Sequence, residues 1–391
     1  MALPSVQAYL YGVDGRVSES LLGALLLSLV CSVLAKYLLQ GVSLGAIWTK
    51  ESHREKVRQD TSPGNAPRYD NIFETMGDIQ PLTNLDWESQ EPERIYRFAD
   101  KYNLTMGLRK TTVNTITHMD EQYISRINER KKILEQYPGA LGCVGAGPDM
   151  VRELYTYLVT WYLPKRYPTM FRVDEPSSYL RNLVLEEDIP LFPPEDPISM
   201  LRTIALSVDE DFLMLLPSPD GDGYSLQAFV WLYPVGFDPA DKLGMKLRDV
   251  HGPVPSYKKH LEMSMDKYFA RLTPGRVVER VNWAVATNSS LCERGEYHLY
   301  SDDQVSSQSD VDLDDTWVRC ELQTLFALPG SGGRILSVHL YLYPIQEIKD
   351  VGLAEEMCRA IDGYGRGNAA EFSRYKRVPV WGEKVKEFLR S

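Results

Sequence analysis

The chain has 391 residues and a formal net charge of −11, a length that suits a large folded domain with additional segments. Its acidic balance, without a basic stripe interleaved with aromatic residues, argues against a nucleic-acid-binding protein. The five cysteines are scattered and form no Cys-x-x-Cys pair, so neither a disulfide framework nor a zinc site is expected, and the body suits a reducing compartment. Aromatic residues make up 10% of the chain, which favours a packed α+β core over disorder.

Residues 20–49 are predicted to form a single membrane anchor within an N-terminal segment, residues 1–50. The stretch is rich in apolar residues and uncharged except for Lys36, and its length suffices to cross a bilayer, although a lysine at mid-membrane is costly. Basic residues follow it, so the positive-inside rule places the body on the cytoplasmic side, with the endoplasmic reticulum as a candidate membrane. The alternative is an amphipathic or buried helix of a soluble protein.

The polar, proline-containing residues 51–94 are predicted to be a linker, and the basic residues 362–391 a peripheral tail. Between them, residues 95–361 are predicted to form one α+β body. Its expected helices are residues 119–136, 150–163 (ending at Pro164), 198–208, 256–272 and 351–361. Its expected strands are residues 212–216, 225–233, 277–286, 317–328 and 334–343, with a flexible Ser/Asp-rich insertion at residues 301–315.

The last two strands are predicted to form a hairpin with a polar cluster on one face. If Leu328 pairs with Arg334 across the turn, Gln323 lies opposite His339 and Glu321 opposite Tyr341. A slip of one residue would move the side chains of one strand to the other face.

His251 is the strongest candidate for a metal or haem ligand. Pro253 and Pro255 restrict the backbone just after it, and the amphipathic helix at residues 256–272 should anchor the turn on the core. A rigidly held imidazole is what an iron ligand requires. The alternative is a hydrogen-bonded structural histidine, and for His339 that alternative and a pocket role are equally favoured. His118 is interpreted as a local helix cap.

Several short motifs occur together in one order along the chain. They are LTMGLR at 104–109, LPKRYP at 163–168, EDF at 210–212, KLG at 242–244, VHGPVP at 250–255, NW at 282–283, RCELQTL at 319–325 and LPGSG at 328–332. Together they resemble the haem-dependent oxidative N-demethylase family, in particular its haem-binding α-subunit-like domain, over roughly residues 95–357.

The resemblance implies a PAS-like antiparallel sheet with surrounding helices that hold haem b. It implies a monooxygenase-type oxidation that uses O₂ to remove a methyl group from a small amine. Reductase signatures do not occur in the chain, so the electrons would come from a separate reductase. His251 would be the axial ligand, and Glu321 could hold a cationic amine. The other implied catalytic or supporting groups are Gln323, His339 and Tyr341, and the other implied cofactor-binding positions are Pro253, Pro255, Asn282, Trp283 and Arg319.

Two other interpretations stay open at this point. The first is a PAS-like haem or small-molecule sensor, or a binding module, without turnover. The second is a structural membrane protein that folds without any cofactor. Substrate-dependent oxygen consumption by a haem-loaded protein distinguishes the oxidase from both of these alternatives.

Overall fold

A computed structural model describes residues 70–295, 297–300, 303 and 311–391. The chain divides into two compact units, Met1–Pro67 and Arg68–Ser391, and all described residues belong to the second unit. No helix within these described ranges is long and apolar enough to span a bilayer. The anchor expected at residues 20–49 and most of the Ser/Asp-rich insertion lie outside the described residues, so both stay predictions.

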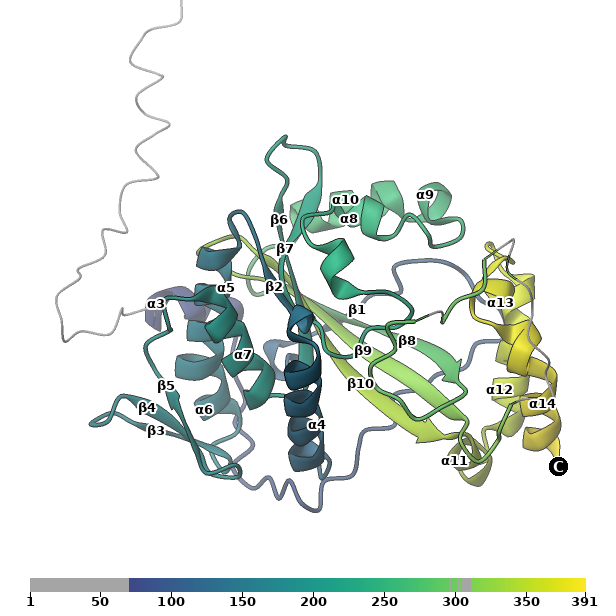
Figure 1. The fold of residues 1–391 in the computed structure, drawn as a ribbon, viewed down its shortest axis with the longest axis horizontal. Helices are drawn as coiled ribbons and strands as arrows, with labels where there is room; N and C mark the ends of the chain where they lie inside the picture. The colour runs from purple at the N-terminus through teal and green to yellow at the C-terminus, as the bar shows by residue number, and fades with distance from the viewer. Residues whose placement is uncertain (1–69, 296, 301–302, 304–310) are drawn as a thin grey trace, which may run out of the picture. The chain divides into compact units, whose positions relative to one another are not determined.

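The centre of the described unit is a seven-stranded antiparallel sheet (Figure 1) in the order β1-β8-β9-β10-β6-β7-β2. Its strands are β1 (Arg109–Thr111), β2 (Leu141–Cys143), β6 (Glu210–Pro217), β7 (Tyr224–Val230), β8 (Val277–Ala286), β9 (Trp317–Ala327) and β10 (Arg334–Pro344). Successive side chains of each strand point to opposite faces. The predicted α+β class and antiparallel sheet are confirmed.

The predicted register of the β9–β10 hairpin is wrong by one residue. Arg334 pairs with Ala327 and not with Leu328, so His339 lies opposite Leu322 and Tyr341 opposite Cys320. The turn is one residue shorter than expected, because Leu328 N–H donates to Gly333 O at 2.8 Å and so closes a tighter loop.

This register separates the predicted polar cluster. Glu321 and Gln323 share a face with Leu340 and Val338, whereas the side chains of His339 and Tyr341 lie on the opposite face.

One group of helices packs beside β6, β7 and β2 (Figure 1). It contains α4 (Tyr123–Gln136), α5 (Gly147–Thr156), α6 (Leu163–Arg166) and α7 (Pro197–Ser207). The helix expected to end at Pro164 runs on to Arg166 through a π-helical segment, Tyr157–Tyr162, in which Leu163 N–H bonds to Leu158 O. The proline, which has no N–H, is accommodated directly after this wide turn. A small sheet of β3 (Phe171–Asp174), β4 (Tyr179–Asn182) and β5 (Glu187–Pro190) lies beside this group.

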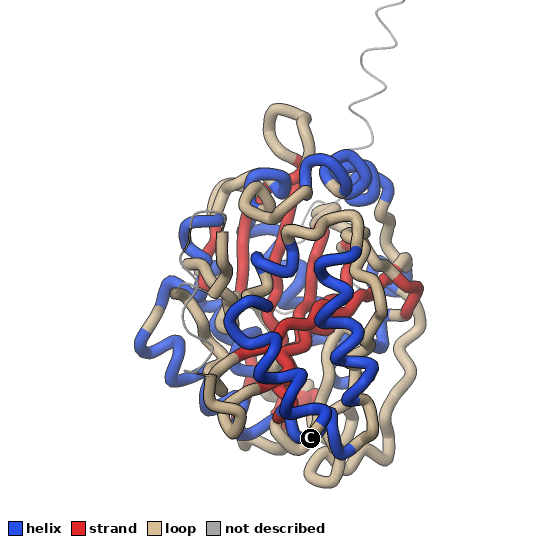
Figure 2. The backbone as a smooth tube through the Cα atoms, turned by 90° about the vertical axis from the view of Figure 1, so that its right-hand side faces the viewer, coloured by secondary structure: helices blue, strands red, loops and turns tan. Residues whose placement is uncertain are grey.

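A second group of helices covers the other end of the sheet: α11 (Ile345–Asp350), α12 (Ala354–Gly363), α13 (Phe372–Tyr375) and α14 (Val378–Arg390). Figure 2 shows the C-terminal helix crossing in front of the strands. The expectation of a peripheral tail is wrong, because Trp381 in α14 is fully buried and its Nε1–H donates to Lys376 O at 3.0 Å.

The described part of the predicted linker is also packed on the body. Phe73, at the end of α3 (Asp70–Phe73), and Met76 are buried in the main core.

Candidate functional site

One face of the sheet forms the floor of a cavity of about 340 Å³. Its walls come from α8 (Leu247–Val250), the turn after it, and α10 (Glu262–Arg271), together with segments around residues 102–108, 297–300 and 372–376. The lining is mostly apolar: it includes Leu213, Leu226, Leu325, Leu336, Leu340, Met265 and Phe269. A concave apolar site with a few polar groups is the usual form of a small-molecule or cofactor site.

His251 lies in this wall, at the C-terminal end of α8. Its Nδ1 is 2.8 Å from Leu247 O, and because a carbonyl only accepts, Nδ1 carries the hydrogen and Nε2 is the free acceptor. The ring stacks on Tyr257, with centroids 5.0 Å apart and planes at 14°. Burial lowers the pKa of His251, so the imidazole is neutral at physiological pH. The His251 ring is therefore neutral, and its hydrogen bond to the backbone fixes its orientation.

The helix predicted after His251 is present in two pieces, α9 (Tyr257–His260) and α10. Tyr257, Leu261 and Met265 are buried, as the amphipathic pattern predicts. Ser256 adopts a left-handed conformation (φ 59°) at the start of α9. The chain thus turns sharply between His251 and the helix that anchors it.

A second histidine, His298, lines the same cavity. Its ring stacks on Tyr375, with centroids 4.1 Å apart and planes at 9°, and burial lowers its pKa to about 4. Its Nδ1 is buried without a hydrogen-bond partner among the described residues. No pattern in the sequence around His298 marks it as a site residue.

The polar part of the floor is centred on Glu321. Its Oε2 accepts hydrogen bonds from Asn282 Nδ2 at 3.2 Å and from Gln323 Nε2 at 2.8 Å. Lys376 Nζ donates to Asn282 Oδ1 at 3.2 Å and to Trp283 O at 3.1 Å. Burial lowers the pKa of Lys376 to about 8, against the opposing effect of the Glu321 charge. The carboxylate and the ammonium thus face the same end of the cavity.

Two arginines flank this polar group, Arg319, which is buried, and Arg280, which is partly buried. Arg319 is held by backbone carbonyls, since Nη2 donates to Tyr233 O at 2.9 Å and to Leu291 O at 3.1 Å. Arg280 lines the cavity, and its Nε is buried without a hydrogen-bond partner in the described part of the chain. Burial lowers the pKa of both guanidinium groups, and both stay charged because arginine is not deprotonated in proteins. The unpaired donor of Arg280 suits an anionic group of a ligand.

The structure brings together six of the ten residues that the sequence singled out. The residues that line the cavity are His251, Pro253, Asn282, Arg319, Glu321 and Gln323. Pro255 and Trp283 do not line it, and Trp283 packs on Phe98 and Tyr364. His339 and Tyr341 lie on the opposite face of the sheet, a consequence of the corrected register.

The cavity also contains groups that sequence reasoning missed, above all Arg280 and Lys376. Arg280 could have been predicted from the sequence, because it lies two residues before Asn282 on a strand and therefore on the same face. No sequence signal marks Lys376.

A comparison with protein families agrees with this arrangement. The model of the family described as "haem-dependent oxidative N-demethylase, alpha subunit-like" matches residues 107–386. The chain belongs to this family. The match includes His251, the sheet floor and Lys376, and so covers most of the cavity. The description of this family names haem as the cofactor and N-demethylation as the reaction.

Proposed function

We propose that the cavity would hold haem b, with His251 as the protein ligand to its iron, and that the protein oxidatively demethylates a small amine. The observation that carries the proposal is the hydrogen bond from His251 Nδ1 to Leu247 O. It fixes the tautomer and orientation of the ring and leaves Nε2 as the metal-binding atom, as second hydrogen bonds of haem and metal histidines commonly do.

The remaining lining fits a haem group. The walls are apolar, as a porphyrin face requires, and Arg280 and Lys376 supply cations where acidic side groups of the ring could be bound. The five strands β6 to β10 lie in the sheet order β8-β9-β10-β6-β7, which is 2-1-5-4-3 when read from β7 and numbered in chain order. This order supports the PAS-like interpretation.

When bound, haem would supply the activation of O₂. The residues of the chain would then hold the amine beside it. Both amide donors to Glu321 go to Oε2, so Oε1 is left to accept a hydrogen bond from a substrate ammonium. Asn282 and Gln323 fix the carboxylate in that orientation, and the apolar walls exclude water from the methyl group. Electrons would come from a separate reductase.

The test of haem binding is the visible spectrum of the full-length chain, purified with haem supplied. We expect a Soret band that is lost or strongly shifted in His251→Ala. His298→Ala tests the other histidine of the cavity, and His260→Ala is a matched control outside it. A spectrum unchanged in His251→Ala but altered in His298→Ala would reassign the ligand, and no band in any version would overturn haem binding.

Turnover needs its own measurement, because a sensor or binding module of this fold would also bind haem. With a chemical or enzymatic reductant and a panel of methylated amines, we expect substrate-dependent oxygen consumption and formaldehyde release. Glu321→Gln should raise the KM for the amine more than it lowers kcat. Haem-loaded protein that consumes no oxygen with any amine would favour the module without turnover.

A further inference from the structure

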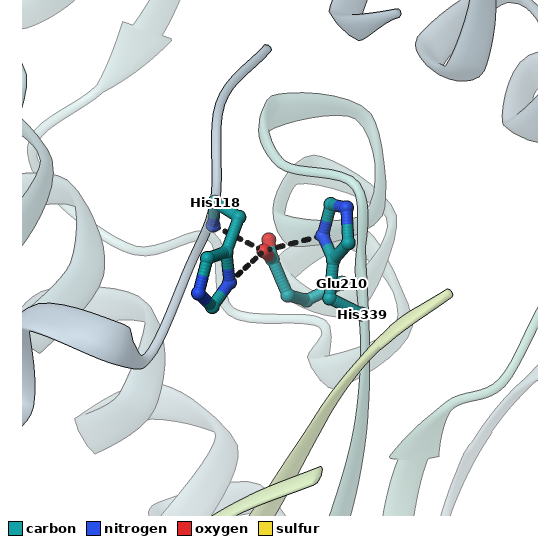
Figure 3. A group of neighbouring side chains, drawn as sticks. All are labelled: His118, Glu210 and His339. Carbon is teal, nitrogen blue, oxygen red and sulfur yellow. Dashed lines mark hydrogen bonds and ion pairs between the residues drawn. The ribbon is translucent and has the colours of Figure 1, made fainter. Parts of the chain in front are cut away.

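A second group of chemically active side chains lies on the sheet face opposite the cavity. His118, Glu210 and His339 each offer a ligand atom, and these atoms all lie within 4.8 Å of one another. Figure 3 shows the Glu210 carboxylate between the two imidazole rings. Two histidines and one carboxylate are a frequent ligand set for first-row divalent ions.

The three residues come from distant parts of the sequence. His118 lies in the loop before α4, Glu210 begins β6 and His339 lies in β10, directly opposite Glu210 in the sheet ladder. Cross-strand neighbours on one face have side chains close enough to share an ion. The loop then brings His118 over this pair, with its ring 5.3 Å from that of His339.

The separations between ligand atoms are near those of a coordinated ion. His339 Nδ1 is 3.0 Å from Glu210 Oε1, and His118 Nδ1 is 3.7 Å from the same oxygen. An ion about 2.1 Å from each ligand places neighbouring ligand atoms about 3.0–3.4 Å apart in octahedral or tetrahedral geometry. The His118 ring must move closer to complete this geometry, and its side chain is the most exposed of the three, at 17%.

Hydrogen bonding within the group leaves polar atoms without partners. Glu210 Oε1 receives His118 N–H at 2.5 Å and faces both rings, whereas Glu210 Oε2 and His118 Nδ1 are buried without a hydrogen-bond partner in the described residues. The Glu210 side chain is fully buried. Buried carboxylate oxygens are normally satisfied, so each unpaired atom requires an explanation. A bound cation explains both at once.

The nearby arginines do not fill this role. Arg130 Nη1 is bound to Asp211 at 3.0 Å, and Arg126 Nε is 3.7 Å from Asp209. Asp209 Oδ2 also lies 4.0 Å from His339 Nε2. A carboxylate beside the outer nitrogen of a histidine ligand is the usual means of orienting that ligand.

We propose that His118, Glu210 and His339 form a binding site for a divalent first-row transition-metal ion, such as Zn²⁺ or Fe²⁺, separate from the cavity on the other face of the sheet. Nδ1 of each histidine and the Glu210 carboxylate are its three protein ligands. The partly exposed side of His118 is the route by which the ion enters. The site does not depend on haem being bound, because none of its ligands lines the cavity.

The test uses the full-length chain, purified without an affinity tag that binds metal, and stripped of metal by a chelator. Zn²⁺ binding is measured by equilibrium dialysis with elemental analysis, and Fe²⁺ binding in the same way without oxygen. Haem iron is counted separately from its pyridine complex and subtracted. We expect about one ion per chain and a higher unfolding temperature in its presence. Elemental analysis of the protein as purified identifies the resident ion.

Three substitutions decide whether the ion is at this site. His118→Ala should weaken binding by at least about 10–100-fold, the loss seen even for residues that only support a metal ligand, and Glu210→Gln and His339→Ala should do the same. His260→Ala is the control and should bind as the unsubstituted chain does. Glu210 and His339 are buried, so their variants could fail to fold. In that case, the metal binding of His118→Ala alone decides whether the ion is at this site. No saturable binding by the parent chain, or binding unchanged in a folded His118→Ala protein, would overturn the proposal, and neither result bears on the haem site.

Discussion

Replacing Arg130 by methionine should destabilise the protein more than any other change to a charged side chain of α4. Arg130 is fully buried, and its guanidinium donates to Ala205 O at 2.7 Å, to Glu210 O at 2.8 Å and to Asp211 Oδ1 at 3.0 Å. Asp211 also accepts the backbone N–H groups of Leu232 and Tyr233. The pair therefore ties α4 and the end of α7 to β6 and the chain after β7.

The expected loss in the free energy of unfolding follows from the buried groups that lose their partner in Arg130→Met. The Asp211 carboxylate loses its cation inside the core, and two buried carbonyls lose their donor. Removing one partner of a buried ion pair costs about 3–5 kcal/mol. For a folded unit of roughly 320 residues, with an unfolding entropy of about 2.1 cal/mol/K per residue, this corresponds to a fall of roughly 4–7 °C in Tm.

The assay is thermal unfolding followed by intrinsic fluorescence, which the seven tryptophans support. Lys132→Met, on the same helix but with a side chain 66% exposed, is the control and should change stability by less than about 0.5 kcal/mol. Asp211→Asn and the double variant complete a cycle. The double variant should be less destabilised than the sum of the single variants by about 1 kcal/mol or more. Additive costs, or an Arg130→Met variant as stable as the control, would refute the reasoning.

Three further outcomes are expected. The pKa of Lys376 is about 8 in the folded protein and ordinarily 10.5, so the unfolded chain binds more protons between these two pH values. The free energy of unfolding should therefore rise with pH across that window, by about 3 kcal/mol at most. Measuring the free energy of unfolding against pH should show this rise in the parent and not in Lys376→Met. Glu153→Ala removes the carboxylate that accepts Gly330 N–H at 2.5 Å and Ser331 N–H at 2.6 Å. Denaturant unfolding should show a loss of about 2–4 kcal/mol in the free energy of unfolding, and a smaller loss in Glu153→Gln. Equal losses in the two variants would contradict this account of the turn. Trp381→Ala should cost about 3–5 kcal/mol, whereas a stable variant with unchanged near-ultraviolet circular dichroism would show that α14 does not depend on this anchor.

Elements with a clear local pattern were predictable from the sequence. Strand β8 has the predicted bounds, and α7 begins and ends one residue before the helix predicted at 198–208. In both cases the signal is local, because it depends on the kinds of residue that follow one another along a short stretch of chain. The helix after His251 was predictable for the same reason.

What the sequence could not supply depends on contacts between distant residues. The register of β9 and β10 is set at a turn whose amides bind Glu153, which is 177 residues away from Gly330, and a shift of one residue there moved His339 out of the predicted cluster. Lys376 reaches the cavity because Trp381 anchors the segment that follows it. His118 reaches Glu210 and His339 only through the path of a loop, and the spacing of these residues in the sequence does not predict that they come together.

The π-helical turn Tyr157–Tyr162 holds about one residue more than an α-helix would over the same rotation. Each residue of an α-helix turns the chain by about 100°, and each residue of the wider π turn rotates it by less. A one-residue deletion that restored ordinary α-helical geometry would therefore leave α5 and α6 in nearly the same relative orientation. The fully buried Met150 and Tyr155 would stay on the core side with Tyr162 and Tyr167. Homologous chains that lack the extra residue should therefore keep the same apolar positions along α5 and α6, with the spacing between the two sets one residue shorter.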